Sequence, residues 1–157
     1  MRIGLGQDSH RFSNSPKPLV FGGVKFDEYP CLKGNSDADV LIHSLCNALS
    51  STVGGESLSI WTDNMCQQGI IDSREYLKHI NSIVSKDFVI NNISISVEAQ
   101  IPRLSSDQKS TIKQQLANIL EISTNQIGIT YTSGEDLTSF GQKKGIQVFS
   151  TVLLSEK

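Results

Sequence analysis

One aspartate and two histidines are placed where they could bind a metal ion together. Asp8 and His10 are two residues apart in a segment that reads as a strand, and residues i and i+2 of a strand project from the same face. His43 follows in a segment with helical spacing, so a helix could bring it to the same point. A catalytic zinc commonly takes three nitrogen or oxygen ligands and keeps a fourth position for water or substrate. The three residues therefore predict a zinc site with an open position.

Each of these residues also has a structural alternative. Asp8 and His10 could simply form a turn after a strand, and His43 could be a partly buried histidine with ordinary hydrogen bonds. Asp37 and Asp39 have the residue type of a helix N-cap, and Asp37 is the favoured cap. Asp39 lies four residues before His43 on the helix, which is a spacing from which its carboxylate could orient that ligand.

The composition is that of an ordinary globular protein. The chain has 157 residues, a formal net charge of -2 and 38% hydrophobic residues, which suits one domain with a buried core. Nucleic acid is not an expected partner, because phosphate contacts would need a basic surface. Three cysteines without C-x-x-C spacing suggest neither a disulfide framework nor a thiolate zinc site. No run approaches the roughly 20 apolar residues that span a bilayer, so we expect a cytoplasmic protein without membrane contact.

Hydrophobic periodicity predicts the elements that must position the three ligands. Strands are expected at residues 2–7, 19–21, 24–26, 93–97, 127–132 and 146–154. A helix that Ser36 or Asp37 caps should contain His43 in its second turn and end at Gly54-Gly55. Residues 56–71 have no sustained period and are expected to form a long loop.

Two further helices are expected in the second half of the chain. Ser73 has the residue type of an N-cap and precedes an apolar stripe, and Ser105 or Ser106 opens the other helix. The order of elements predicts an α/β sandwich, in which helices pack on one face of a mixed sheet. The whole chain, residues 1–157, is expected to form this single domain.

Four motifs in a fixed order make the chain resemble a known family. They are Asp8-Ser9-His10, Ser36-Asp37-Ala38-Asp39-Val40 followed by His43, Ala99-Gln100-x-Pro102, and Thr132-Ser133-Gly134-Glu135. With these motifs the chain resembles the 2-C-methyl-D-erythritol 2,4-cyclodiphosphate synthase family over essentially its full length. The resemblance implies an enzyme of non-mevalonate isoprenoid biosynthesis. Such an enzyme converts 4-diphosphocytidyl-2-C-methyl-D-erythritol 2-phosphate to the cyclic diphosphate and releases cytidine monophosphate (CMP).

The resemblance also implies two metal ions and a trimer. Asp8, His10 and His43 would hold zinc, and Glu135 would hold a second divalent cation, magnesium or manganese, together with the substrate diphosphate. Family members form homotrimers whose active sites lie between subunits, with the zinc on one subunit and the cytidine pocket on its neighbour. Intramolecular phosphoryl transfer needs in-line positioning and cancellation of phosphate charge, which two metals supply.

The substrate-contacting residues follow from the same resemblance. Asn35 and Ser133 occupy catalytic positions, and Asn35 with Ser36 would meet the 2-phosphate end of the substrate. Arg103 replaces the usual lysine of the nucleotide pocket, which keeps the charge and adds fork geometry. The methylerythritol unit would contact Glu56, Ser57, Leu58, Trp61 and Asp63, and the cytosine and its phosphates would contact Ala99, Arg103, Leu104, Ser105, Thr132 and Ser133.

The chain departs from the family pattern at positions that bear on rate and on ligand binding. Asn35 stands where the family usually has a histidine that helps to stabilise charge in the transferring phosphate, and asparagine cannot be cationic. Gln7 and Gln142 replace an aromatic residue and an arginine that line the central cavity of some trimeric relatives. We therefore expect weak or no binding of an isoprenoid diphosphate in that cavity, unless Lys143 or Lys144 substitutes.

Two other functions fit the same residues. A zinc hydrolase could use metal-bound water on the same three ligands, and its product would be a linear phosphate instead of a ring. A catalytically weakened nucleotide-binding homologue would keep the fold and the nucleotide pocket and lose the transfer chemistry. Asn35 and the altered segment 56–62 are the features that favour this second alternative.

Overall fold

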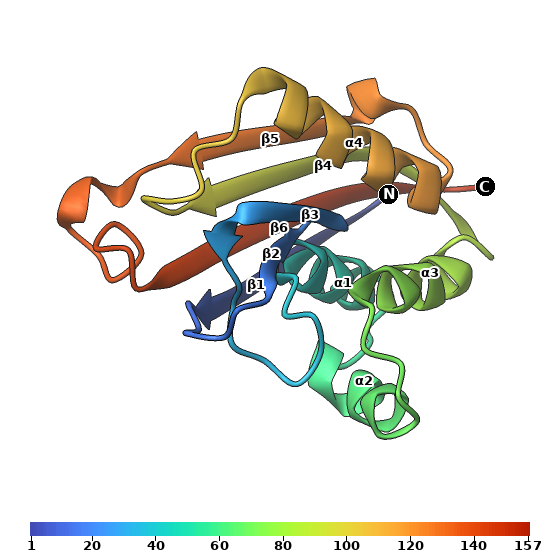
Figure 1. Cartoon of the computed structure of the whole chain (residues 1–157). Helices are drawn as coiled ribbons and strands as arrows, with labels where there is room; N and C mark the ends of the chain where they lie inside the picture. The colour runs from blue at the N-terminus through green and yellow to red at the C-terminus, as the bar shows by residue number, and fades with distance from the viewer.

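Four strands form one mixed sheet in the computed structural model, which describes residues 1–157 (Figure 1). They are β1 (Arg2–Arg11), β4 (Phe88–Glu98), β5 (Ile127–Thr132) and β6 (Gly145–Glu156). Their order across the sheet is β1-β6-β4-β5, with β4 and β5 parallel and the other neighbours antiparallel. The predicted mixed sheet is confirmed, and every predicted strand lies within an observed one.

Helices cover one side of this sheet. They are α1 (Val40–Thr52), α2 (Leu58–Gln67), α3 (Ser73–Val84) and α4 (Ser106–Leu120). The first helix, α1, packs on β1 and β6, α3 packs beside α1, and α4 contacts β5, as Figure 1 shows. This arrangement confirms the predicted α/β fold with helices on one face. None of the helices has the length and hydropathy of a membrane span.

Alternating burial shows which sheet face carries the core. In β4 the apolar residues of 93–97 are buried, whereas the two serines between them are exposed. The buried side chains belong to one apolar cluster that the helices complete. On the opposite face Ile3, Leu5 and Phe149 are 75%, 62% and 43% exposed. The opposite face of the sheet therefore has exposed apolar side chains that no element of this chain covers.

A separate hairpin holds the start of α1 in place. Its strands are β2 (Pro18–Phe21) and β3 (Val24–Pro30), and its turn residues Gly22 and Gly23 have φ angles of 63° and 76°. Glycine adopts these positive angles without steric cost. The two turn amides donate hydrogen bonds of 2.9 and 2.6 Å to the carboxylate of Asp39, which precedes α1.

Asp39 caps α1, so the prediction of Ser36 or Asp37 as its cap is wrong. Its carboxylate also accepts a 3.0 Å hydrogen bond from the amide of the helix's third residue. Because the Gly22-Gly23 turn and the helix end take up this carboxylate, Asp39 does not orient His43, and that prediction is wrong as well. Burial, together with the neighbouring carboxylate of Asp37, raises the pKa of Asp39 above its ordinary value.

The sequence predicted the N-cap of α4 correctly, but not the N-cap of α3. The carboxylate of Asp72 accepts a 2.9 Å hydrogen bond from the Arg74 amide and caps α3. The predicted cap, Ser73, is instead the first residue inside the helix, with a buried side chain. The prediction for α4 is confirmed, because Ser105 and Gln108 form a reciprocal capping box.

Residues 56–71, which were expected to form a long loop, contain α2. Leu58, Trp61 and Met65 are partly buried and pack against the core at helical spacing. Thr62 is the one fully buried residue of this helix, and the N-cap makes no side-chain hydrogen bond. The helix therefore depends on tertiary contacts more than on local sequence, which is why periodicity alone did not indicate it.

Two glycines allow α1 to lie very close to β1. A Cβ atom at Gly4 or Gly6 would come within 2.1 or 2.0 Å of a carbonyl oxygen of α1. Asp8 and His10 continue β1 on the same face as these glycines, because side chains alternate along a strand. The close approach therefore sets the distance between His43 in α1 and the two predicted ligands, Asp8 and His10, in β1.

Candidate metal centre

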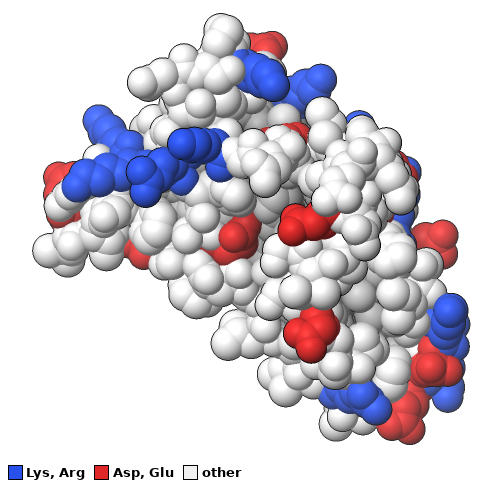
Figure 2. Space-filling model, turned by 90° about the horizontal axis from the view of Figure 1, so that it is seen from below, with Lys and Arg blue, Asp and Glu red and all other residues white.

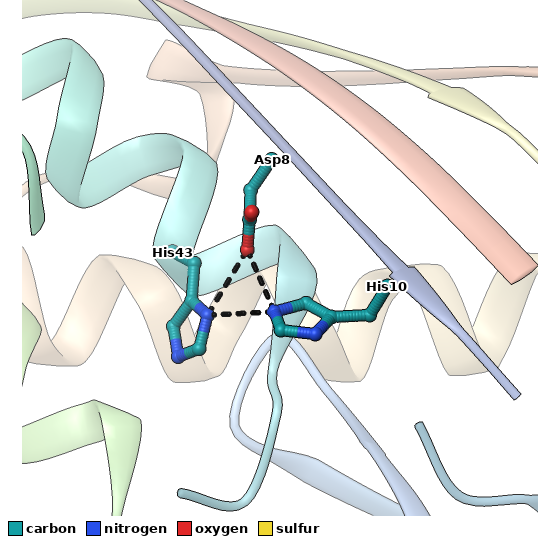
Figure 3. Close-up of side chains that lie close together, drawn as sticks. All are labelled: Asp8, His10 and His43. Atoms are coloured by element: carbon teal, nitrogen blue, oxygen red, sulfur yellow. Dashed lines mark hydrogen bonds and ion pairs between the residues drawn. The ribbon is translucent and has the colours of Figure 1, made fainter. Parts of the chain in front are cut away.

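The close contact between β1 and α1 brings Asp8, His10 and His43 together (Figure 3). The Oδ2 atom of Asp8 lies 3.0 Å from both His10 Nε2 and His43 Nδ1, and these two nitrogens are 3.3 Å apart. Ligand atoms about 2.0–2.2 Å from a tetrahedral zinc are separated from one another by about 3.4 Å. The triangle is thus close to the size that a divalent metal ion needs, and the three residues fit such an ion.

Hydrogen bonds fix which ring nitrogens face the centre. His10 Nδ1 lies 2.7 Å from the Lys33 carbonyl oxygen, which can only accept, so Nδ1 carries the proton. When the ring is neutral, as a metal ligand must be, His10 Nε2 therefore presents a lone pair to the centre. His43 presents Nδ1 to Asp8, while its Nε2 lies 2.8 Å from the hydroxyl oxygen of Ser73.

The charges of the centre suit a cation. Burial alone would raise the pKa of the Asp8 carboxyl, but His10 and His43, which donate hydrogen bonds to Asp8 when their facing nitrogens carry protons and no metal is bound, outweigh burial and hold that pKa well below its ordinary value. Burial would lower the pKa of His10, and the hydrogen bond to Asp8 reverses this effect and raises it. Asp8 is therefore an anion at neutral pH, ready to act as a metal ligand.

The three residues line a cavity of about 260 Å³ that also contains part of the predicted substrate site. The predicted residues that line it are Asn35, Ser36, Ser57, Leu58 and Asp63. Glu56 is exposed and lies outside this lining. Trp61 is also outside this lining, and its ring centroid lies 6.4 Å from that of Tyr76 and 5.3 Å from that of His79.

A second cavity, of about 210 Å³, lies where the parallel strands β4 and β5 end. The predicted residues that line it are Ala99, Arg103, Leu104, Thr132 and Ser133. Ser105 is outside this lining and caps α4, while Glu135 lies exposed in a short 3-10 turn and lines neither cavity. Within one chain, the structure therefore places most of the predicted site residues in two separate groups, and leaves Glu56, Trp61, Ser105 and Glu135 outside both.

Basic side chains gather at the end of the molecule that carries the β5–β6 connection, on the left of Figures 1 and 2. Lys143 and Lys144 of this connection line a third cavity, of about 590 Å³, together with Arg11 and His10. Gln142 is outside that lining, and its side-chain amide donates to the Asp136 carbonyl oxygen. The expectation of weak isoprenoid diphosphate binding stays a prediction.

Several residues of the metal cavity had no signal in the sequence. Asn47, Cys66 and Tyr76 line it beside the predicted residues. Tyr76 was expected only in the apolar stripe of α3, yet its hydroxyl donates to the Ile70 carbonyl oxygen and lies 2.9 Å from Cys66 Sγ. Helical periodicity identified the buried face but could not show that one end of a buried side chain reaches a cavity.

Comparisons with known proteins identify the class to which this fold and metal centre belong. The family model of the YgbB family matches residues 1–155, and the chain belongs to this family. It is 41% identical over 158 residues to the 2-C-methyl-D-erythritol 2,4-cyclodiphosphate synthase of Chlamydia muridarum, covering 99% of this chain and 88% of the relative. The protein of the same name from Chlamydia trachomatis serovar A is 37% identical with the same coverage. The resemblance inferred from the four motifs is confirmed.

Solved structures agree with this assignment. A Plasmodium falciparum IspF structure, described as a CDP complex, matches with a TM-score of 0.85 and 28% identity, covering 99% of this chain and 96% of that one. The bifunctional IspDF from Campylobacter jejuni matches with a TM-score of 0.88 and 33% identity, covering 99% of this chain and 42% of that one. The fold found here is thus the fold of IspF structures.

Proposed function

We propose that this chain is a 2-C-methyl-D-erythritol 2,4-cyclodiphosphate synthase. The single observation that carries the proposal is the Asp8–His10–His43 triangle, set in a chain 41% identical to a relative of that name. In the reaction, the 2-phosphate of 4-diphosphocytidyl-2-C-methyl-D-erythritol 2-phosphate attacks the β-phosphate of the same molecule. The new phosphorus–oxygen bond closes the ring, the bond to the α-phosphate breaks, and CMP leaves. The three free cysteines suit the reducing cytoplasm as the place of this reaction.

The chain's own residues would hold and orient the reacting groups. Zinc on Asp8, His10 and His43, and magnesium or manganese on Glu135 with the diphosphate, would cancel phosphate charge. Asn35 lines the metal cavity, where its side-chain amide can donate to the 2-phosphate. Arg103 lines the second cavity, where its guanidinium can pair with the phosphates that follow the cytidine. Ser133 in the same cavity supplies a hydroxyl donor.

A homotrimer would unite the two groups of residues. The metal cavity and the nucleotide cavity share no residue within one chain, although the substrate must touch both groups at once. The uncovered sheet face, with Ile3, Leu5 and Phe149 exposed, supplies an apolar surface for other copies of the chain. These two features support an assembly in which one copy brings its zinc site to the nucleotide cavity of the next.

The identity of the product tests the proposed reaction against the zinc hydrolase. Phosphorus NMR of the reaction mixture should show two coupled resonances of a cyclic diphosphate, together with CMP. A linear phosphate product would contradict the cyclase and favour the hydrolase. Binding of cytidine nucleotides without any product would favour the catalytically weakened homologue, which Asn35 and segment 56–62 keep as the second candidate.

A further inference from the structure

Behind His43, on the side away from the metal centre, the buried side chain of Ser73 and the half-buried side chain of Asp37 continue its hydrogen bonding. Ser73 lies at the start of α3 and is fully buried, and its hydroxyl oxygen is 2.8 Å from His43 Nε2. The same hydroxyl makes a short hydrogen bond to Oδ1 of Asp37. Oδ2 of Asp37 accepts a second hydrogen bond, of 3.0 Å, from the Ser73 amide. Asp37 therefore accepts two hydrogen bonds from Ser73, and the Ser73 hydroxyl contacts the imidazole ring of His43.

The direction of these hydrogen bonds follows from the chemistry of the groups. A carboxylate can only accept, so the proton of the Ser73 hydroxyl is committed to Asp37. The hydroxyl oxygen can then only accept from His43, which places the ring proton on Nε2. The lone pair of His43 is left on Nδ1, the atom that lies 3.0 Å from Asp8 in the metal centre.

Helix capping accounts for only part of these contacts. Asp39 caps α1 and Asp72 caps α3, and Asp37 accepts the first amide of α3, that of Ser73. The hydrogen bond between the Ser73 hydroxyl and Asp37, and the contact of that hydroxyl with His43, cap no helix. The second imidazole of the centre differs, because His10 is held by a backbone carbonyl, that of Lys33. His43 is thus the ligand whose orientation depends on side chains.

We propose that Ser73 and Asp37 are positioning residues for the zinc ligand His43. The inference rests on the proposed zinc site and adds to it two residues that never touch the metal. By fixing the proton on Nε2 and holding the ring in place, they make His43 Nδ1 a ready ligand. Removing such a hydrogen-bond partner of a metal-binding histidine typically weakens metal affinity by about 10–100-fold.

The test is the zinc affinity of purified variants, measured by competition with a chromogenic chelator. Ser73→Ala removes the hydroxyl, and Asp37→Asn keeps the shape but loses one of the two oxygens that accept from Ser73. We expect zinc affinity to fall by about 10–100-fold in Ser73→Ala and by less in Asp37→Asn. Ser73→Thr keeps a hydroxyl and should retain most of the wild-type zinc affinity. The absorption spectrum of bound cobalt should shift in Ser73→Ala, because the orientation of one ligand changes.

Asp72→Ala is the matched control. It removes the cap of the same helix end, one residue from Ser73, without touching His43. It should lower stability and leave zinc affinity unchanged. Zinc affinity within twofold of wild type in Ser73→Ala, or an equal fall in Asp72→Ala, would overturn the positioning role. A wild-type chain that binds no zinc would overturn the zinc site of the proposed function itself, and the positioning role with it.

Discussion

Asp8 is the only anion among the three residues of the metal centre. This fact determines which ligand the open coordination position of a bound metal would favour. A divalent ion on one carboxylate and two neutral imidazoles keeps a net charge of +1. A positive centre attracts an anionic phosphate oxygen more strongly than neutral water. The hydrogen bonds that lower the pKa of Asp8 keep this carboxylate ionised, so it is available as a ligand throughout the neutral pH range.

Asn35 is the residue that most directly sets the expected rate. It lines the metal cavity, where the family usually has a histidine. A cationic side chain there would stabilise developing phosphate charge, and each 1.4 kcal/mol of such stabilisation is about tenfold in rate. We therefore expect Asn35→His to raise kcat by roughly tenfold, measured as CMP release, with little change in KM. A rise of several orders of magnitude from near zero would instead identify the natural chain as a weakened homologue.

At the scale of elements, the contact between β1 and α1 carries the geometry of the centre. A Cβ at Gly6 would lie 2.0 Å from a carbonyl oxygen of α1, so Gly6→Ala must push the helix away. We expect a loss of about 1–3 kcal/mol in the free energy of unfolding, measured by urea denaturation, together with weaker zinc binding. Gly128→Ala is the control, because its nearest neighbour would be 3.8 Å away and stability should hardly change. Equal stability of both variants would contradict this account of the contact.

The start of α3 gives a prediction about pH. A hydrogen bond from Arg74 lowers the pKa of Asp72 below its usual 3.8. The folded-state pKa is depressed, so this stabilisation is present above pH 3.8 and is lost as the pH falls through the lowered value. Asp72→Ala should cost about 1 kcal/mol at pH 7 and less in strong acid. Asp72→Asn keeps a side-chain oxygen that can cap α3, so it should lose only the pH-dependent part of the stability that Asp72 provides. Urea denaturation at a series of pH values measures this loss. A constant difference between wild type and Asp72→Ala at all pH values would contradict this.

Local sequence rules predicted the elements better than the contacts between them. The spacing of Asp8 and His10 correctly placed two side chains at one point, because alternation along a strand is a property of the backbone. Asp37 and Ser73 could not be paired in this way, since they are 36 residues apart in the chain and meet only after α1 and α3 pack together. The same limit applies to α2, whose helical conformation depends on packing against the core.

For the whole molecule, the uncovered sheet face predicts assembly. Leu5 lies on this face, 62% exposed in the single chain. Leu5→Lys should break the proposed trimer into smaller species in analytical ultracentrifugation, because a charge would be buried between copies. Each chain should still bind zinc, since its three ligands come from one chain, while turnover should be lost. Ile83→Lys, on α3 and away from the sheet, is the control and should stay trimeric. A Leu5→Lys variant that is fully trimeric and active would exclude this face as the interface.

The most direct test of the proposed function is CMP release from 4-diphosphocytidyl-2-C-methyl-D-erythritol 2-phosphate by trimeric protein supplied with zinc and magnesium. We predict one CMP for each cyclic diphosphate formed, with activity lost in Asp8→Asn and on removal of zinc by a chelator. Asp63→Asn, which changes a cavity residue outside the metal triangle, should still bind zinc. Trimeric, zinc-loaded wild-type protein that releases no CMP would contradict the assignment.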